Sequence, residues 1–295
     1  MEYEGQICRP PMERSSFMLP VAVGCSYNRC TFCTLFKHLR YRQLPIEQVE
    51  AELQRVHDAG GNPEQVFLGD GNAFCMSTDH LLRILELVHR YLPGCRMVNM
   101  DATITNISQK SDEELKQLYD QGVRRLYIGI ETGLDDVLTF TKKDHNLQQA
   151  YTQIARMQQA GLVFNAHIMT GIAGRGRGME NAEKTADFFN RTRPERITNF
   201  SLFLHRRAPL YQDYQAGRFV PASELDNLIE DRRLIELLDV PELVYDGFHD
   251  MLKVRVRGTL PQDKEKMLKQ FDEAIEKYCN EPPVYAVLVL CPCLI

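Results

Sequence analysis

Three cysteines lie within nine positions of the segment "VAVGCSYNRCTFCTLFKH", which covers residues 21–38. Cys25, Cys30 and Cys33 follow an apolar run that ends in glycine, and they form the chain's tight cysteine cluster. Thiolates are soft ligands that suit zinc and iron–sulfur clusters. Three thiolates can hold three irons of a four-iron cluster and leave the fourth iron open. The spacing therefore predicts a metal centre with a free coordination position.

A zinc site is the alternative from the same segment. His38 follows Cys33 after four residues, so Cys30, Cys33 and His38 resemble part of a zinc knuckle. Structural zinc normally has a closed set of four ligands, and Cys25 would complete that set. Such a site would belong to a zinc or iron–sulfur protein without catalytic activity. Ligand spacing alone leaves both interpretations open.

Strand-like runs and amphipathic helices alternate along the first two thirds of the chain. The second helix is predicted to be capped by Thr78 or Asp79, and Ser111 and Glu114 have the spacing of a capping box. The pattern predicts strands over 16–24, 65–71, 95–103, 124–133, 162–171 and 196–205, and helices over 45–60, 78–92, 111–122, in two pieces up to 159, and over about 180–190.

Six strand–helix units in series predict an α/β fold with a parallel sheet and right-handed crossovers. Cys25 follows the first strand, so the metal is expected at the carboxyl-terminal rim, where barrel enzymes carry their chemistry. Helices are expected within 206–238 and over 261–279, before an apolar tail. We assign 1–205 to a partial barrel and 206–295 to a C-terminal helical extension packed on it.

Composition narrows the function classes. A chain of 295 residues with 44% hydrophobic content can bury a full core, and its net charge of −5 argues against a broad nucleic-acid or membrane surface. The first residues have no basic start followed by an apolar stretch, and no run of about 18 apolar residues occurs. We predict a soluble cytoplasmic protein. In that reducing compartment its nine cysteines are expected to be metal ligands or free thiols rather than disulfides.

With Phe32 before the third cysteine, this arrangement resembles the radical S-adenosylmethionine (radical SAM) superfamily, whose members carry three cysteines after the first strand of a partial (βα)6 TIM-like barrel. The resemblance covers about residues 16–205. The resemblance is strongest with the branch that contains the oxygen-independent coproporphyrinogen oxidase and Elongator. It is carried there by the segments "LYIGIETGLDDVL" and "TKKDHNLQQA". Two features differ from the family: four residues separate the first two cysteines instead of three, and the glycine-rich turn after the second strand is Gly69-Asp70-Gly71-Asn72.

The resemblance implies an oxygen-sensitive [4Fe-4S] cluster on Cys25, Cys30 and Cys33 and a radical SAM enzyme. S-adenosylmethionine would bind the open iron and be cleaved reductively to a 5′-deoxyadenosyl radical, which takes hydrogen from a substrate. It also implies that the cofactor contacts are Phe32, Asp70, Gly71, Asn72, Asp101, Glu131, Lys143 and His167. The sequence assigns no catalytic residue.

Each of these contacts has an ordinary structural alternative. Asp70 and Asn72 would bind the cofactor's ammonium group, or they are turn residues. Glu131 would contact the ribose or amino group, or form a structural ion pair. Lys143, near His145, would meet the carboxylate, or it ends a helix in solvent. His167 would contact the ribose, or it is a hydrogen-bonded core histidine.

The substrate is expected to be a small molecule, and an anionic one would suit Arg175, Arg177, Arg206 and Arg207. The resemblance also implies an electron donor such as flavodoxin or ferredoxin. A radical SAM enzyme that modifies tRNA or a peptide is the alternative, because "KHLRYR" (37–42) alternates basic residues with aromatic or aliphatic ones, although the acidic chain argues against nucleic acid. The roles of Cys75, Cys291 and Cys293 stay open: a hydrogen-atom donor or a buried thiol for the first, an auxiliary cluster for the pair.

Overall fold

The computed structural model describes residue 4 and residues 8–288 of the chain. Cys291 and Cys293 lie outside these residues. The chain divides into two compact units by packing. The first unit takes in the described residues up to Asn28 together with Leu35–Ile128 and Tyr151–Phe164; the second takes in Arg29–Thr34, Gly129–Ala150 and the described residues from Asn165 onward. The boundary predicted at residue 205 is a different division and stays a prediction.

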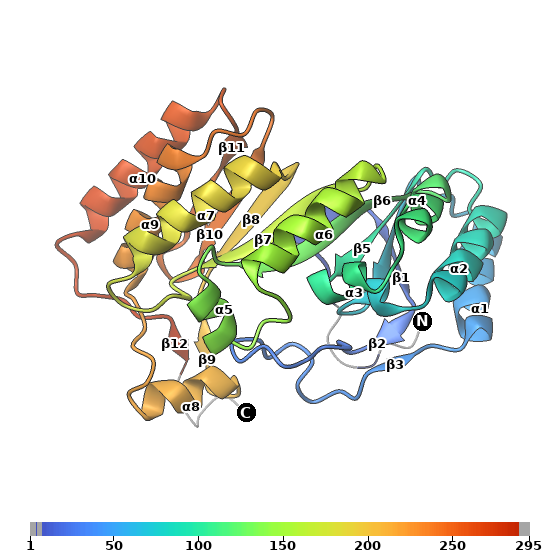
Figure 1. Ribbon diagram of the computed structural model, residues 1–295, viewed down its shortest axis with the longest axis horizontal. Helices are drawn as coiled ribbons and strands as arrows, with labels where there is room; N and C mark the ends of the chain where they lie inside the picture. The colour runs from blue at the N-terminus through green and yellow to red at the C-terminus, as the bar shows by residue number, and fades with distance from the viewer. Residues whose placement is uncertain (1–3, 5–7, 289–295) are drawn as a thin grey trace. The chain divides into compact units, whose positions relative to one another are not determined.

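The first unit contains the parallel strands β1 (Phe17–Pro20), β4 (Gln65–Gly69), β5 (Met97–Ala102) and β6 (Val123–Glu131), hydrogen-bonded in that order. Residues such as Leu19 and Phe67 are fully buried, as in parallel strands covered on both faces. The helices α1 (Ile46–Asp58), α2 (Thr78–Tyr91) and α4 (Asp112–Asp120) lie side by side (Figure 1).

Short elements complete this unit. They are the 3₁₀ turns η1 (Pro11–Glu13) and η2 (Ala73–Cys75), the helix α3 (Ile104–Ser108), and the antiparallel pair β2 (Ala22–Val23) and β3 (Arg42–Gln43). The capping box of Ser111 and Glu114 is confirmed. The predicted cap of α2 is wrong: Ser77 is the N-cap, and its hydroxyl accepts a hydrogen bond from the His80 amide. Thr78 and Asp79 begin the helix instead.

The second unit contains β7 (Val163–Thr170), β8 (Arg196–Ser201), β10 (Val244–His249) and β11 (Val254–Thr259) in that order. The first three strands run parallel, and β11 is antiparallel to β10. The helices are α5 (Asp135–Phe140), α7 (Gly178–Thr192), α8 (Pro209–Gln215), α9 (Glu224–Leu237) and α10 (Lys264–Tyr278), with the 3₁₀ turn η3 (Asp250–Leu252) and the strand pair β9 (Leu204–His205) and β12 (Val287–Leu288). α9 packs between α7 and α10 (Figure 1). The remaining helix, α6 (Leu147–Gln159), contains residues of both units, and so do β6 and β7.

The alternation of strands and helices is confirmed, but the extension after residue 205 is not only helical. β10 and β11 lie in it, and the sequence analysis did not predict them. Their sequences "VYDGFH" and "VRVRGT" are short and contain Asp246, Gly247 and Gly258, residue types that are depleted in strands, which weakens the strand signal. Pairing with β8 buries Tyr245 completely and explains why this segment is a strand.

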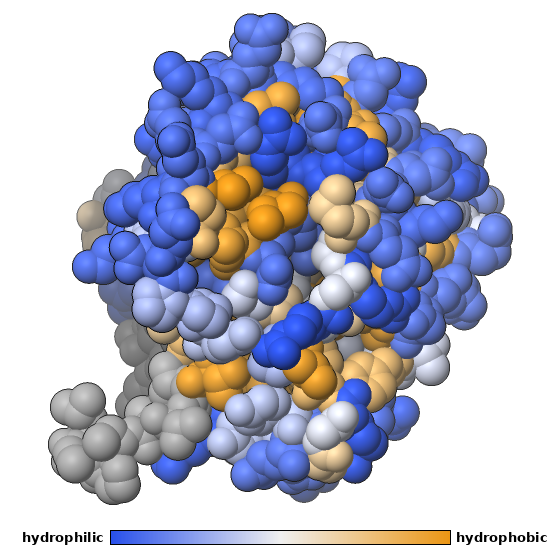
Figure 2. Space-filling model, turned by 90° about the vertical axis from the view of Figure 1, so that its left-hand side faces the viewer, coloured by the Kyte–Doolittle hydropathy of each residue, from blue (hydrophilic) through white to orange (hydrophobic). Residues whose placement is uncertain are grey.

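The surface on the left-hand side of Figure 1 is mainly hydrophilic, with apolar side chains in separate patches (Figure 2). Exposed large apolar residues of the second unit include Met179, Phe203, Val220 and Met251. In the part of the chain that the structure describes, no helix is long and apolar enough to cross a membrane.

Candidate functional site

The cysteine loop is anchored by its backbone in the second unit. The Thr31 amide donates to the Thr141 carbonyl, and the Thr31 carbonyl accepts from the Leu210 amide, each at 2.9 Å. Phe32 packs against an apolar cluster that includes Leu134 and Leu210. These contacts fix the segment that carries Cys30 and Cys33. Phe32 was predicted to contact the cofactor, and that contact stays a prediction.

Cys25, Cys30 and Cys33 are partly exposed and form no disulfide. Burial raises the pKa of the Cys30 thiol to about 11, Lys143 opposes this rise, and the charges of Glu131, Cys33 and Asp144 add to it. A thiolate at this position therefore needs a strong cation, which an iron–sulfur cluster supplies. Among the residues that the structure describes, no three His, Cys, Asp or Glu side chains are arranged to hold a metal ion. Cys25 belongs to the first unit, and Cys30 and Cys33 belong to the second. Three thiolates are the ligand type that a four-iron cluster with one open iron requires.

Glu131 and Lys143 form a buried ion pair beside Cys30. The Lys143 Nζ lies 3.1 Å from Glu131 Oε1 and 3.9 Å from Asp144 Oδ1, and the two paired side chains are only 7% and 10% exposed. Burial lowers the pKa of Lys143, but the charges of Glu131, Cys30 and Asp144 outweigh it and raise the pKa. The sequence analysis assigned Glu131 and Lys143 to different groups of the cofactor, whereas here they contact one another. Their cofactor roles stay predictions.

Two histidines lie near this pair. His145 Nδ1 is 3.1 Å from Asp144 Oδ1, and its buried Nε2 has no hydrogen-bond partner. The His167 ring meets the Phe200 ring edge-on, with centroids 6.1 Å apart. Burial, with the charge of Lys143, lowers the pKa of His167 to about 4, so its imidazole is neutral at pH 7. A neutral imidazole can hydrogen-bond a hydroxyl group.

The turn after β4 lies in the first unit, next to the backbone that precedes Cys25. A Cβ built on Gly71 would lie 2.9 Å from the Gly24 carbonyl oxygen and 2.7 Å from the Phe36 ring, so this close approach requires glycine. The Gly71 amide donates to Asp70 Oδ1 at 2.9 Å. Burial raises the pKa of Asp70 to about 6, and the backbone amides of Gly71, Gly24 and Cys8 oppose this rise.

Asp101 belongs to the same acidic group. Burial raises its pKa to about 7, and the charges of Asp70 and Glu13 add to this rise. Glu13 is buried and accepts hydrogen bonds from Asn99 Nδ2 at 2.9 Å and from the Tyr127 hydroxyl at 2.5 Å. The sequence analysis missed Glu13, because a glutamate in "PPMERSS" carries no signal of burial. A cationic group bound here would relieve the repulsion among the three carboxylates.

Asn72, the last residue of that turn, is 1% exposed. Its Nδ2 donates to Ser26 Oγ at 2.9 Å and to Asn106 Oδ1 at 2.5 Å. The turn therefore connects Asn72 to Ser26, which follows Cys25, and places Asp70 where its charge acts on Asp101; the cofactor roles of these residues stay predictions.

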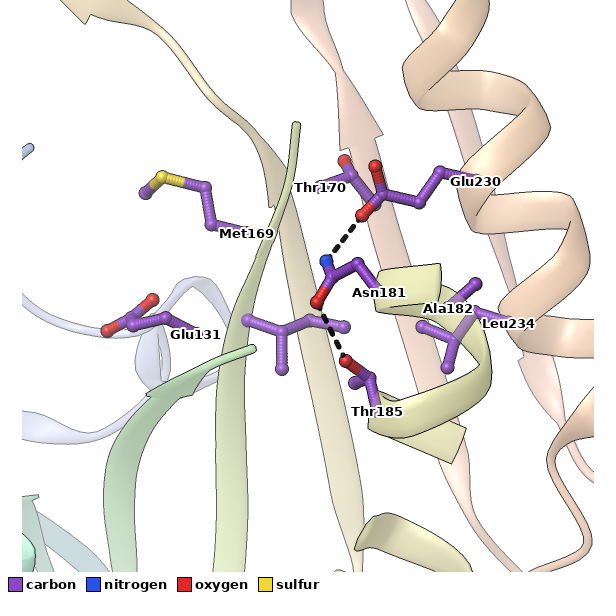
Figure 3. A pocket seen from close by; sticks show the side chains of 9 residues that line it. Glu131, Met169, Thr170, Asn181, Ala182, Thr185, Glu230 and Leu234 are labelled. Atoms are coloured by element: carbon purple, nitrogen blue, oxygen red, sulfur yellow. Dashed lines mark hydrogen bonds between the residues drawn. The ribbon is translucent and has the colours of Figure 1, made fainter. Parts of the chain in front are cut away.

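A small cavity of about 10 Å³ lies in the second unit between β7, α7 and α9. Figure 3 shows Asn181 between Glu230 and Thr185: the Asn181 amide donates to Glu230 Oε1 at 2.6 Å, and the Thr185 hydroxyl lies 3.3 Å from Asn181 Oδ1. Glu131 also lines the cavity. Its volume is close to that of one water molecule, so the cavity as it stands does not admit a substrate.

Glu230 makes the stability of the protein pH-dependent. Burial raises its pKa to about 8 from 4.5, although Asn181 and the Gly171 amide oppose the rise. Because the folded pKa lies above the unfolded value, the protonated group stabilises the fold below pH 4.5, and this contribution is lost as pH rises through about 8. We expect the Tm of the Glu230→Gln variant to fall less than that of the wild type between about pH 5 and about pH 9. Thermal unfolding across this range checks it, with the exposed Glu236→Gln as control; equal slopes for wild type and Glu230→Gln would contradict the assignment.

α9 turns a row of buried polar side chains toward the strands, at Glu224, Asn227 and Asp231. Asp231 accepts from the Tyr245 hydroxyl and lies 3.0 Å from His249 Nε2. The sequence analysis missed this network. The spacing of three and four residues between its helical members was the available signal.

A model of the Radical SAM superfamily matches residues 19–189. The chain is similar to the heme chaperone HemW of Bacillus subtilis, with 25% identity over 197 residues that make up 64% of this chain and 51% of the relative. The archaeal Elp3 of Methanocaldococcus infernus covers 89% of this chain and 63% of its own, with 14% identity and a TM-score of 0.55. The cobalamin-dependent S-adenosylmethionine radical enzyme OxsB, with aqua-cobalamin and S-adenosylmethionine bound, covers 88% and 46%, with 14% identity and a TM-score of 0.59.

The likeness to the two solved structures shows a shared fold. The chain spans about half the length of the curated relative HemW. The matched region 19–189 contains the cysteine loop, the turn after β4 and the Glu131–Lys143 pair.

Proposed function

This chain belongs to the radical SAM superfamily, and we propose that it is an enzyme that cleaves S-adenosylmethionine reductively and uses the product radical on a small substrate. The observation that carries the proposal is the family match over residues 19–189, which contains all three cysteines of the predicted cluster. The resemblance to the superfamily is confirmed by this match, and the similarity to HemW agrees with it.

The cofactors of this superfamily are a [4Fe-4S] cluster and S-adenosylmethionine. Cys25, Cys30 and Cys33 would hold the cluster. When bound together, the two cofactors supply the electron transfer that yields methionine and a 5′-deoxyadenosyl radical, which takes a hydrogen atom from the substrate. A flavodoxin- or ferredoxin-like donor would provide the electron, and a reducing cytoplasm would protect the cluster.

The residues of the chain support distinct parts of this activity. The carboxylates of Asp70 and Asp101 lie close to one another, and Asp70 lies beside the backbone before Cys25, which suits the ammonium group of S-adenosylmethionine. Lys143 is charged and buried beside Cys30, which suits the cofactor's carboxylate if Glu131 turns toward the ribose. Neutral His167 suits a ribose hydroxyl. Packing around Phe32 would exclude water from the loop.

Cleavage of S-adenosylmethionine tests the proposal. Protein prepared anaerobically with its cluster is expected to form 5′-deoxyadenosine and methionine in equal amounts after addition of dithionite and S-adenosylmethionine. Omission of dithionite is the control, and no product is expected there. Protein with a complete, reducible cluster that forms neither product would contradict the proposed activity.

A further inference from the structure

The hairpin of β2 and β3 separates two clefts in the first unit. Val23 pairs with Arg42, and Ala22 pairs with Gln43. Neighbouring side chains of a strand point to opposite faces. Accordingly, Arg42 lines one cleft, of about 600 Å³, and Gln43 lines the other, of about 320 Å³. Tyr41 lines both.

The smaller cleft, which we call the tyrosine cleft, offers aromatic rings and amides without charge. Its rings are those of Tyr27 and Tyr41, and its amides are those of Gln43, Asn106 and Gln109. None of its lining side chains is Asp, Glu, Lys, Arg or His. Aromatic faces stack on planar bases, and amides both donate and accept hydrogen bonds, as the edge of a nucleobase requires. The volume lies at the lower end of the range for small-molecule sites.

The amide of Asn106 is held in place at the wall of the tyrosine cleft. Its Oδ1 accepts from Asn72 Nδ2 at 2.5 Å and from the Thr103 hydroxyl at 2.6 Å, while its Nδ2 donates to Gln109 at 3.2 Å. Behind it, the buried Asn72 Oδ1 has no hydrogen-bond partner. The cleft therefore has an ordered polar wall, and the buried acceptor Asn72 Oδ1 belongs to the residue that holds this wall from behind.

The larger cleft, which we call the basic cleft, carries His38, Arg40 and Arg42. Arg42 pairs with Glu4, and both side chains are about half exposed, at 46% and 57%. An exposed pair of this kind contributes little to stability and exchanges partners readily. Arginine is suited to phosphate because its guanidinium group donates two parallel hydrogen bonds. A phosphate is the anion that this cleft fits by its chemistry.

Both clefts lie near Cys25, the cysteine of the predicted cluster that belongs to the first unit. β2 leads through Gly24 directly into Cys25. The Tyr41 hydroxyl is 2.8 Å from the Cys75 thiol, and Cys75 lines the tyrosine cleft. Burial raises the pKa of Tyr41, and the Cys75 and Cys25 thiols add to that rise. A molecule in the tyrosine cleft would lie beside the first cysteine of the cluster.

We propose that the two clefts together bind a nucleoside phosphate, with its base against Tyr27 and Tyr41 and its phosphate against Arg40 and Arg42, and that the ligand passes from one cleft to the other at Tyr41, which lines both. This ligand is the substrate, an inference that rests on the proposed function. The net charge of −5 does not oppose it, because the recognition is local. The nucleotide is either a free molecule or a unit of single-stranded RNA, which present the same chemistry.

Binding to the anaerobically prepared holoenzyme tests the proposal. The probes are the four common nucleoside 5′-monophosphates, the corresponding nucleosides, ribose 5-phosphate and a pentanucleotide RNA. The binding of each probe is measured by calorimetry. We expect at least one monophosphate to bind about tenfold or more tightly than both its nucleoside and ribose 5-phosphate. No nucleotide binding, or ribose 5-phosphate binding as tightly as the best nucleotide, would overturn the proposal.

Variants assign the two parts of the ligand to the two clefts. Tyr27→Ala is expected to weaken both nucleoside and nucleotide roughly tenfold, because the stacking ring is lost. Arg40→Gln is expected to weaken binding of the nucleotide and to leave binding of the nucleoside unchanged. The controls are Tyr214→Ala and Arg191→Gln, exposed residues of the second unit, and no effect is expected from either. Controls that weaken binding as much as the cleft variants would overturn the assignment.

The remaining measurements identify the source of the nucleotide and distinguish this inference from the proposed function. Tighter binding of the pentanucleotide than of any monophosphate, with a steep salt dependence, supports single-stranded RNA; the reverse order supports a free nucleotide. Displacement of the nucleotide by S-adenosylmethionine alone would overturn the inference, because the tyrosine cleft would then belong to the cofactor. Cleavage of S-adenosylmethionine without nucleotide binding leaves the proposed function standing and removes only this inference. Nucleotide binding to protein with a complete cluster, without cleavage, would remove the proposed function and with it the ligand's role as substrate, and would leave only the binding site standing.

Discussion

Replacing Cys30 by alanine is expected to abolish cleavage of S-adenosylmethionine and to remove most of the bound iron. The same result is expected for Cys25→Ala and Cys33→Ala, because a four-iron cluster with one open iron needs all three thiolates. Loss of an outer-shell partner of a metal site already reduces affinity about 10- to 100-fold, so loss of a ligand is expected to exceed that range. Iron content and 5′-deoxyadenosine formation, measured on anaerobically reconstituted protein, check the prediction.

Two control variants make this prediction specific. Cys279 is an exposed free thiol whose Sγ lies 3.1 Å from the Glu276 carbonyl oxygen, and Cys279→Ala is expected to keep both iron and activity. His38→Ala is expected to keep the iron as well, because His38 is an exposed residue of the basic cleft and the cluster uses no imidazole. Loss of the metal in His38→Ala, with retention in Cys25→Ala, would contradict the cluster and favour the zinc interpretation.

Lys143→Met is expected to destabilise the protein by about 3–5 kcal/mol, the usual cost of leaving one partner of a buried ion pair uncompensated. The Glu131 carboxylate would remain buried beside Cys30 and Asp144, both of which add negative charge. Glu131→Gln is expected to destabilise the protein less. Asp144 Oδ1 lies 3.9 Å from the Lys143 Nζ and still compensates part of the buried Lys143 charge. Denaturant unfolding of the holoenzyme measures each variant.

The double variant Glu131→Gln/Lys143→Met separates the structural role of the pair from its cofactor role. Removing both charges is expected to restore part of the stability, because no buried charge is left alone. Binding of S-adenosylmethionine is expected to stay weak in the double variant, because the proposed function gives both side chains a cofactor contact, Lys143 with the carboxylate and Glu131 with the ribose. The control Lys269→Met removes an exposed ion pair with Glu273 at 3.8 Å and is expected to change stability by less than about 1 kcal/mol. A Lys143→Met variant no less stable than this control would contradict the buried pair.

Sequence reasoning reached the features that depend on local spacing. Cys25, Cys30 and Cys33 are informative because their residue type and separation already restrict the chemistry. The capping box of Ser111 and Glu114 was predictable for the same reason, since its two hydrogen bonds join residues three positions apart. The first six parallel strands were predictable because short β-rich runs alternate with amphipathic helices along the chain.

Features that depend on distant contacts were not predictable. The ion pair of Glu131 and Lys143 joins residues twelve positions apart through the turns around α5. The hydrogen bond from Asn99 to Glu13 spans 86 positions, and no local pattern announces it. The apolar cluster that packs against Phe32 was not predictable either, because its members Leu134 and Leu210 lie about a hundred or more positions later. β10 was missed because the parallel partner that buries it, β8, lies more than 40 residues earlier.

The central claim is that the three thiols of the Cys25–Cys33 loop hold an iron–sulfur cluster with one open iron. Elemental analysis of the anaerobically purified wild-type protein, together with an acid-labile sulfide assay, measures this directly. The account predicts about four irons and four sulfides per chain, and an electron paramagnetic resonance signal of the reduced cluster that changes when S-adenosylmethionine is added. Stoichiometric zinc without sulfide in this preparation would contradict it.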